Sequence, residues 1–137
     1  MDRANAWAVA RLTALGFENV RTHEYPITGW VRGEESAVVV GANAQPLVLT
    51  TLVNSVATPA RGIEAEIALF RTYDELLAAP VGSLRGKIAV VTQVMTTTQD
   101  GSGYGAANPI RSAGASEAAK RGAVAYLIRS LGTHSHR

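Results

Sequence analysis

The segment KIAVVTQ at residues 87–93, with SAGASEAAKR at 112–121 and AVAYLI at 123–128, decides the fold class of this chain. The first and third segments have continuously apolar centres, which is typical of strands covered on both faces. The middle segment is rich in small residues and ends at Gly122, so it predicts a helix. Because strand, helix and strand follow in this order, we expect a parallel pair with a right-handed crossover.

The residues before this unit indicate mainly neighbouring strands. We predict strands over 19–27, 36–40, 46–52 and 63–70, the last because its apolar side chains alternate with polar ones. The second and third of these fit a hairpin. Short helices are predicted at 2–15, ended by Gly16, and at 73–79, ended by Pro80. The chain is therefore predicted to be a mixed α+β domain with a curved or barrel-like sheet.

The composition of the 137-residue chain narrows its class. It is 47% hydrophobic and 18% charged, which indicates a globular domain. Its longest apolar runs, near 37–42 and 123–128, are far shorter than the roughly 20 residues of a membrane span, and its start lacks the pattern of a signal peptide. The absence of cysteine excludes disulfides and Cys-based zinc sites. The 13 Lys and Arg residues are scattered and the net charge is +2, so nucleic-acid binding is not expected.

The glycine-rich segment from Gly101 to Ala106 matches the G-x-G-x-x-A pattern of dinucleotide sites. In such sites the glycines lie directly between a strand and the helix that they open. Here several polar residues separate them from the preceding strand, and Pro109 separates them from the predicted helix. We therefore expect residues 96–109 to form a polar surface loop.

The histidines raise the question of a metal site. His134 and His136 lie two positions apart, so they face the same side of an extended segment. Zinc sites need three or four protein ligands, and no acidic residue lies near this pair. We expect two solvated histidines, and keep a small metallohydrolase built on them as an alternative. His23 is expected to face solvent, and the sequence singles out neither a G-x-S-x-G motif nor a catalytic carboxylate pair.

Three groups of motifs, in this order, resemble a known family. They are YPITGWVRGEESA at 25–37; TPARGIEAE at 58–66 with YDEL at 73–76 and LRGKI at 84–88; and YG at 104–105 with IR at 110–111, GA at 114–115, AAKRGA at 118–123 and LIRS at 127–130. Together they are similar to the N-terminal part of the carboxypeptidase Q-like zinc aminopeptidases of the M28 peptidase family. In particular they resemble the protease-associated (PA) domain of that family.

The resemblance implies a PA-like fold, a partly open β-barrel or mixed sheet flanked by short helices. It implies no catalytic residues in this chain, because the family binds zinc in a separate catalytic domain and uses the PA domain for substrate access or protein contact. Residues 1–52 would lead into the inserted domain and residues 53–137 would form it. One departure is Val53, where the family tends to have glycine. Valine resists a positive φ, so we expect a rebuilt loop there.

We therefore expect a non-catalytic module of an M28-like zinc peptidase, with no cofactor in this chain, whose partners are the catalytic domain and a peptide substrate. The expected contact residues are Tyr104, Arg111 and Arg129, since an arginine fork binds carboxylates or backbone carbonyls. A structural hydrogen bond or salt bridge is the alternative for both arginines. The alternative for the chain is a free-standing interaction module that forms homo-oligomers through an exposed strand edge. The parent family suggests an exported protein.

Overall fold

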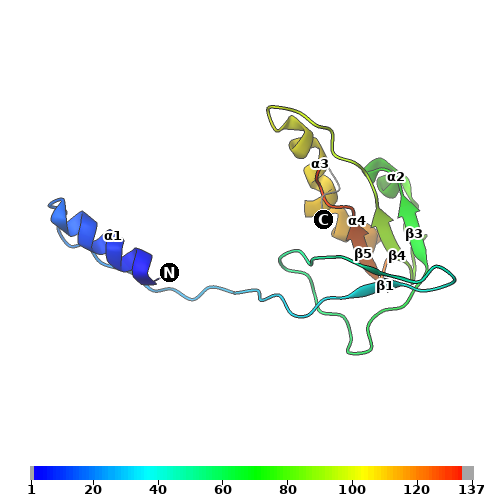
Figure 1. Ribbon diagram of the computed structural model, residues 1–137, viewed down its shortest axis with the longest axis horizontal. Helices are drawn as coiled ribbons and strands as arrows, with labels where there is room; N and C mark the ends of the chain where they lie inside the picture. The colour runs from blue at the N-terminus through cyan, green and yellow to red at the C-terminus, as the bar shows by residue number, and fades with distance from the viewer. Residues whose placement is uncertain (1, 134–137) are drawn as a thin grey trace. The chain divides into compact units, whose positions relative to one another are not determined.

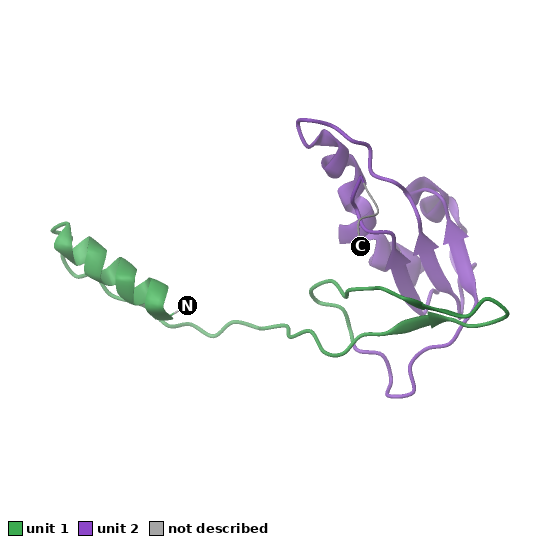
Figure 2. Ribbon diagram, in the orientation of Figure 1, with its two compact units in different colours: residues 1–56 green, residues 57–137 purple. Residues whose placement is uncertain are grey.

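The computed structural model describes residues 2–133 and separates the chain into two compact units, Met1–Val56 and Ala57–Arg137 (Figure 2). Short helices and two small sheets make up these units, so the predicted mixed α+β class is confirmed. Neither sheet closes into a barrel. In the described part of the chain, no helix is long and apolar enough to cross a membrane.

A three-stranded parallel sheet organises the larger unit. Its strands are β3 (Ile67–Phe70), β4 (Ile88–Val91) and β5 (Ala125–Ile128), in the spatial order β3-β4-β5 (Figure 1). The chain connects β3 to β4 through α2 (Tyr73–Ala78), and β4 to β5 through α3 (Ser102–Ser112) and α4 (Gly114–Lys120). The parallel pairing predicted for the two apolar segments is thus confirmed.

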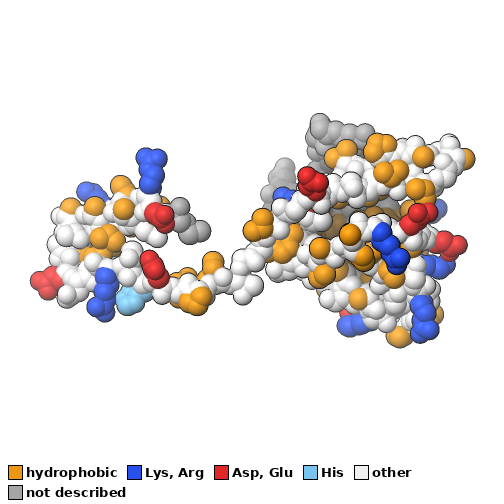
Figure 3. Space-filling model, turned by 90° about the horizontal axis from the view of Figure 1, so that it is seen from below, with side chains coloured by type: hydrophobic (Ala, Val, Ile, Leu, Met, Phe, Trp, Pro, Cys, Tyr) orange, Lys and Arg blue, Asp and Glu red, His pale blue; other side chains and the backbone are white. Residues whose placement is uncertain are grey.

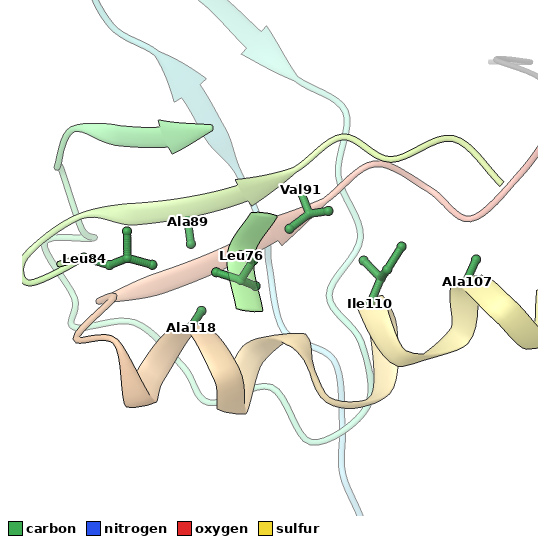
Figure 4. Packing of buried hydrophobic residues seen from close by; sticks show 7 residues of the cluster. All are labelled: Leu76, Leu84, Ala89, Val91, Ala107, Ile110 and Ala118. Atoms are coloured by element: carbon green, nitrogen blue, oxygen red, sulfur yellow. The ribbon is translucent and has the colours of Figure 1, made fainter. Parts of the chain in front are cut away.

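One face of this sheet forms the core together with the helices. Figure 4 shows buried side chains of β4 near those of α2, α3 and α4. The buried cluster consists of Leu76, Leu84, Ala89, Val91, Ala107, Ile110 and Ala118. Full burial of one larger aliphatic side chain contributes about 1.5–3 kcal/mol, so these residues carry much of the stability of the unit.

The strand predicted at 63–70 is shorter in the structure, and it buries the opposite face from the one predicted. It begins only at Ile67, and Ala68 and Phe70 are the residues that pack against the core. The alternation pointed to the opposite face as the buried one, and that prediction is wrong: Ile67 is 52% and Leu69 61% exposed. All four residues of β3 are apolar, so periodicity could not choose between its faces. Pairing with β4 and the side taken by the helices decide it.

The other face of the sheet is equally apolar and lies outside the core cluster. We call it the open sheet face, and it consists of Ile67, Leu69, Ile88, Val90, Ala125 and Leu127. The residues of β4 and β5 on this face are half-buried, so β4 is less completely covered than its sequence predicted.

Residues 102–109, predicted as part of a loop, belong to α3 (Ser102–Ser112) instead. The carboxylate of Asp100 accepts hydrogen bonds from the backbone N–H and the hydroxyl of Ser102, at 3.0 and 2.7 Å, beside the start of the helix. Gly103 is buried, and a Cβ there would lie 2.0 Å from the carbonyl oxygen of Thr96. The glycine therefore serves close packing rather than loop flexibility. The helix predicted at 112–121 correspondingly begins later, at Gly114.

The smaller unit begins with α1 (Asp2–Ala14), close to the predicted bounds. Gly16 follows it with a φ of +86°, and the backbone N–H of Phe17 donates back to the carbonyl of Leu12 at 3.2 Å, as expected for a glycine that ends a helix. The strand predicted at 19–27 is wrong for this chain. Within the described residues the segment has no ladder partner, and a strand requires one.

The predicted hairpin is confirmed as β1 (Ala37–Val39) and antiparallel β2 (Gln45–Leu47). Glu35 links its two flanks, because its carboxylate accepts from the hydroxyl and backbone N–H of Thr51 and from the hydroxyl of Thr50. These hydrogen bonds, first the one from the Thr51 hydroxyl, hold the pKa of Glu35 below its ordinary value.

Arg32 and Trp30 extend this link. The Arg32 guanidinium donates to the carbonyl of Thr51 at 2.9 Å and lies 5.7 Å from the centre of the Trp30 ring, whose indole N–H donates to the carbonyl of Ser55. The turn that precedes Ser55 has its left-handed residue at Asn54, with a φ of +70°. Asparagine tolerates this conformation, so the loop accommodates Val53 without a positive φ.

Candidate functional site

The exposed side of α3 carries two of the predicted contact residues. Tyr104 and Arg111, with Asn108 between them, stand at positions i, i+4 and i+7, so the three share one side of the helix. Tyr104 is 43% exposed, Arg111 is exposed and Asn108 is half-buried. We call these residues the α3 stripe. Burial of Ala107 and Ile110 on the neighbouring side fixes how the helix presents it.

The turn before Tyr104 is held by local hydrogen bonds. Donation from the Ser102 hydroxyl, and then from its backbone N–H, keeps the pKa of Asp100 below its usual range. The hydroxyl of Thr98 accepts from the backbone N–H of Gly103 at 2.9 Å. Tyr104 therefore projects from a fixed first turn rather than from a loose loop.

Arg111 is available for a ligand. Its guanidinium has no hydrogen bond or ion pair with any residue between 2 and 133. A guanidinium binds a carboxylate or backbone carbonyls through its fork of donors, and a phenol ring packs against apolar or peptide groups. The α3 stripe thus has the chemistry to hold an extended peptide or its terminal carboxylate.

The third predicted residue, Arg129, comes from another element. It directly follows β5, and its backbone N–H donates to the carbonyl of Val91 at 2.9 Å. Its side chain is half-buried. Residues after the strands of a parallel sheet meet at one edge, which is where open α/β sheets commonly bind ligands. Of the three predicted contact residues, two therefore lie on α3 and one lies at the carboxyl edge of the sheet.

Sequence reasoning missed Asn108 and Arg121. Asn108 joins the stripe only once residues 102–112 are known to be helical. Arg121 is the buried charged residue of the described chain, 8% exposed. Its guanidinium donates to the carbonyls of Leu77, in the last turn of α2, and of Ala79, the residue that caps that helix, and to the carboxylate of Glu117 at 2.9 Å. Arg121 thus connects the end of α2 to α4. A single basic residue at the end of a helix does not reveal such a role in the sequence.

The acidic groups with shifted pKa values also serve structure. Lys120 and Arg121 donate to Glu117, at 2.6 and 2.9 Å, and hold its pKa below the ordinary value. Glu35 and Asp100 are shifted in the same direction by hydroxyl and backbone donors. A general acid at neutral pH needs a raised carboxyl pKa, so these three groups have the opposite tuning.

No group of three or more His, Asp or Glu side chains that could share a metal ion occurs between residues 2 and 133. His23 is exposed, as predicted, and its Nε2 accepts from Nε of Arg21 at 3.1 Å. His134 and His136 lie outside the described residues.

A shallow hollow of about 500 Å³ occupies the other, amino edge of the parallel sheet. Its lining comprises Pro59, Arg61, Gly62, Ile63, Glu64, Ala65, Gly86 and Val124. Both charged residues are exposed, so the hollow has no buried polar anchor. The α3 stripe is therefore the better candidate site.

Comparison with known proteins gives one consistent set of relatives. No family model matches the chain. It is 42% identical over 120 residues to carboxypeptidase Q of Rattus norvegicus, covering 88% of this chain and 24% of that protein. It is 38% identical over 135 residues to carboxypeptidase Q of Bos taurus, covering 98% of this chain and 27% of that protein.

A solved structure extends the likeness to three dimensions. The crystal structure of a peptidase M28 precursor from Shewanella amazonensis SB2B is 42% identical, with a TM-score of 0.84, over 99% of this chain and 31% of that chain. The chain thus spans about a quarter of the length of the curated relatives it matches, and under a third of the solved one.

Proposed function

We propose that this chain, which is homologous to a segment of the M28-family carboxypeptidase Q, serves as a non-catalytic protease-associated module of an M28-like zinc peptidase. The observation that carries the proposal is that the homology runs over 98% of the chain and therefore includes the α3 stripe. In this role the module governs substrate access or contacts the catalytic domain.

The proposal assigns a structural role to the described carboxylates whose pKa values are shifted. Three carboxylates have lowered pKa values because structural donors bind them. Zinc requires three or four protein ligands, and residues 2–133 offer no such group, so they do not fit the metal and no catalytic step is assigned to them. The zinc would be bound by the catalytic domain of the peptidase.

The α3 stripe would supply the contact surface, and Arg129 would add a second contact from the carboxyl edge of the sheet. Arg111 would pair with a peptide carboxylate or with carbonyls, and Tyr104 would pack against the peptide beside it. Neither residue belongs to the buried core cluster, so replacing either one should leave the fold intact and any loss of activity would report on contact with a ligand or partner.

A chimera tests the proposal in an intact peptidase. This chain replaces the segment of the Shewanella amazonensis protein that it matches, and hydrolysis of peptides is followed. Arg111→Ala is expected to lower kcat/KM about threefold to tenfold, because an exposed charge-assisted hydrogen bond is worth about 1 kcal/mol. Arg61→Ala, an exposed arginine at the opposite edge of the sheet, is the matched control. Equal activity of both variants would remove the contact role of the stripe.

The open sheet face favours a second candidate, a module that assembles with other copies or proteins. Ile67 and Leu69 are more than half exposed on a fully apolar face, and such faces mark interaction sites. Sedimentation of the purified chain distinguishes the two. A strict monomer at high concentration would exclude self-assembly.

A further inference from the structure

The first part of α3 has a sequence that disfavours a helix. Residues 102–108 contain Gly103 and Gly105, and Pro109 follows them inside the helix. Glycine lowers helix stability, and proline has no N–H to donate to the carbonyl four residues before it, which is that of Gly105. Asn108 precedes the proline, and a residue in that position is disfavoured in helical conformation. Contacts outside the helix must therefore supply the stability that the local sequence lacks.

These contacts are sparse before Pro109. Of residues 102–108, Gly103 and Ala107 are buried, and together they offer one methyl group to the core. Ile110 lies beyond the proline and is 2% exposed, and its carbonyl accepts a hydrogen bond from the hydroxyl of Tyr126 at 2.8 Å. The second part of α3 is thus anchored in the core, while the first part gains little from apolar burial.

The polar contacts of the first part stay within one segment, residues 96–108, which we call the strap. The hydroxyl of Thr98 accepts from the backbone N–H of Gly103, and the carboxylate of Asp100 accepts from Ser102. In the described part of the chain, no hydrogen bond links the strap to the sheet, to α2 or to α4. These bonds therefore order the strap internally without fixing it to the rest of the unit.

Charge does not fix the strap in place either. Asp100 is its one charged residue, and the ion pairs formed between described residues lie elsewhere. On the face of the larger unit shown in Figure 3, basic and acidic side chains are mixed rather than gathered into one patch. Figure 1 shows the chain continuing beyond the end of β4 before it enters α3. The strap is thus joined to its unit mainly through its two ends and through Ala107.

We propose that the strap opens locally while the rest of the larger unit stays folded, and that this opening controls the α3 stripe. Segments with little apolar burial and local hydrogen bonds open at a lower free energy than the core does. Tyr104 and Asn108 stand on the strap, whereas Arg111 stands on the anchored second part of α3.

The opening would divide the α3 stripe. In the helical state the local hydrogen bonds hold Tyr104 on the same side of the helix as Arg111, and in the open state this alignment is lost. A ligand that contacts both residues binds the helical state better and shifts the strap toward it. This use of the opening rests on the proposed function, but the opening itself is measured without a peptide.

Native-state hydrogen exchange of the 137-residue chain measures the opening. The amides of residues 106–108 should be about a hundredfold less protected than those of β4, and urea below the unfolding transition should hardly change their protection. The protection of β4 should fall with urea, because its amides exchange when the whole unit unfolds. Equal protection and equal urea dependence in the two places would overturn the proposal.

Two glycines of the strap provide a matched pair of variants. A Cβ at Gly105 meets no atom within 4 Å, whereas a Cβ at Gly103 would collide with the carbonyl oxygen of Thr96. Gly105→Ala should raise the protection of residues 106–108 about fivefold, because alanine favours the helix. Gly103→Ala should abolish that protection while β4 stays protected. Unfolding of the whole unit in Gly103→Ala, or lower protection in Gly105→Ala, would overturn the proposal.

The chimera with the Shewanella amazonensis protein separates this inference from the proposed function. If the strap controls the α3 stripe, Gly103→Ala should lower kcat/KM at least as far as Arg111→Ala does. Full activity of Gly103→Ala beside a weakened Arg111→Ala would overturn the control of the stripe. If Arg111→Ala leaves peptide hydrolysis unchanged, the proposed contact role fails, while the opening measured in the free chain stands.

Discussion

The covered and the open face of the parallel sheet carry the same kind of side chain, yet only one of them is sealed. On the covered face Ala89 and Val91 are 0% and 1% exposed, while on the open face Ile67 and Leu69 are 52% and 61% exposed. The helices pack on one side, so on β4 itself Ala89 and Val91 are buried while Ile88 and Val90 on the other face are half-buried. The position of β3 at the edge of the sheet adds to the exposure of Ile67 and Leu69. Apolar content thus identifies a strand, and the path of its connections decides which face becomes core.

The largest expected contrast between the faces comes from truncating one leucine on each. Leu76→Ala empties a fully buried position against the covered face and should cost about 2–5 kcal/mol of unfolding free energy. Leu69→Ala removes a side chain that is already mostly solvated and should cost well under about 1 kcal/mol in the isolated chain. Urea titration of both variants measures the contrast. Similar losses would show that the open face is covered in solution.

The connection that Arg121 makes on the covered side comes next. Arg121→Ala leaves the carbonyls of Leu77 and Ala79 without their donor and Glu117 without one of its two cations. We expect a loss of about 2–3 kcal/mol. Arg121→Lys should recover less than half of it, since one ammonium cannot reach all three groups. Full recovery in thermal unfolding would mean that charge alone matters at this position.

Close packing between α4 and β5 gives a third contrast. The hydroxyl of Tyr126 donates to the carbonyl of Ile110 at 2.8 Å and would lie 2.1 Å from a Cβ at position 114. Gly114→Ala should therefore cost about 1–3 kcal/mol. Adding Tyr126→Leu to Gly114→Ala should reduce the penalty of the alanine. A double-mutant cycle by urea unfolding checks the coupling, and strict additivity would contradict the clash.

The smallest expected effect is one of pH. Hydrogen bonds from Lys120 and Arg121 hold the folded pKa of Glu117 below its ordinary value, so its ionised form stabilises the fold above that ordinary value. As pH falls from about 5 through the lower folded pKa, this stabilisation is lost. Glu117→Gln should flatten the decline of stability in that range while leaving the shape above pH 6 unchanged. An identical acid slope in both proteins, measured by urea titration, would assign the decline to other carboxylates.

The sequence was informative where one physical cause dominated. The continuously apolar segments before Thr92 and before Arg129, with a small-residue helix between them, were enough to predict the parallel pair. Gly16 was correctly predicted to end α1. In each case the local sequence pattern is compatible with only one local structure.

The failures have a common cause in contacts that are distant along the chain. Gly103 was read as loop-forming because sequence does not show the carbonyl of Thr96 pressed against it. The face of β3 was ambiguous because Ile67 and Ala68 are both apolar. The segment at 19–27 has the composition of a strand but no ladder partner among residues 2–133. Of the candidate site, the types and positions of Tyr104 and Arg111 were predicted, whereas their common helix face and Asn108 were not.

The location of Trp30 beside Arg32 in the smaller unit, together with that of Trp7, has a practical consequence for optical spectroscopy. Trp7 and Trp30, the two tryptophans of the chain, both belong to the smaller unit, while Tyr73, Tyr104 and Tyr126 belong to the larger one. Emission excited where indole alone absorbs therefore reports on residues 1–56, and tyrosine signals report mainly on residues 57–137. Denaturation followed at both wavelengths reads the two units separately. Coincident curves would mean one cooperative transition, and separated curves would give each unit its own midpoint.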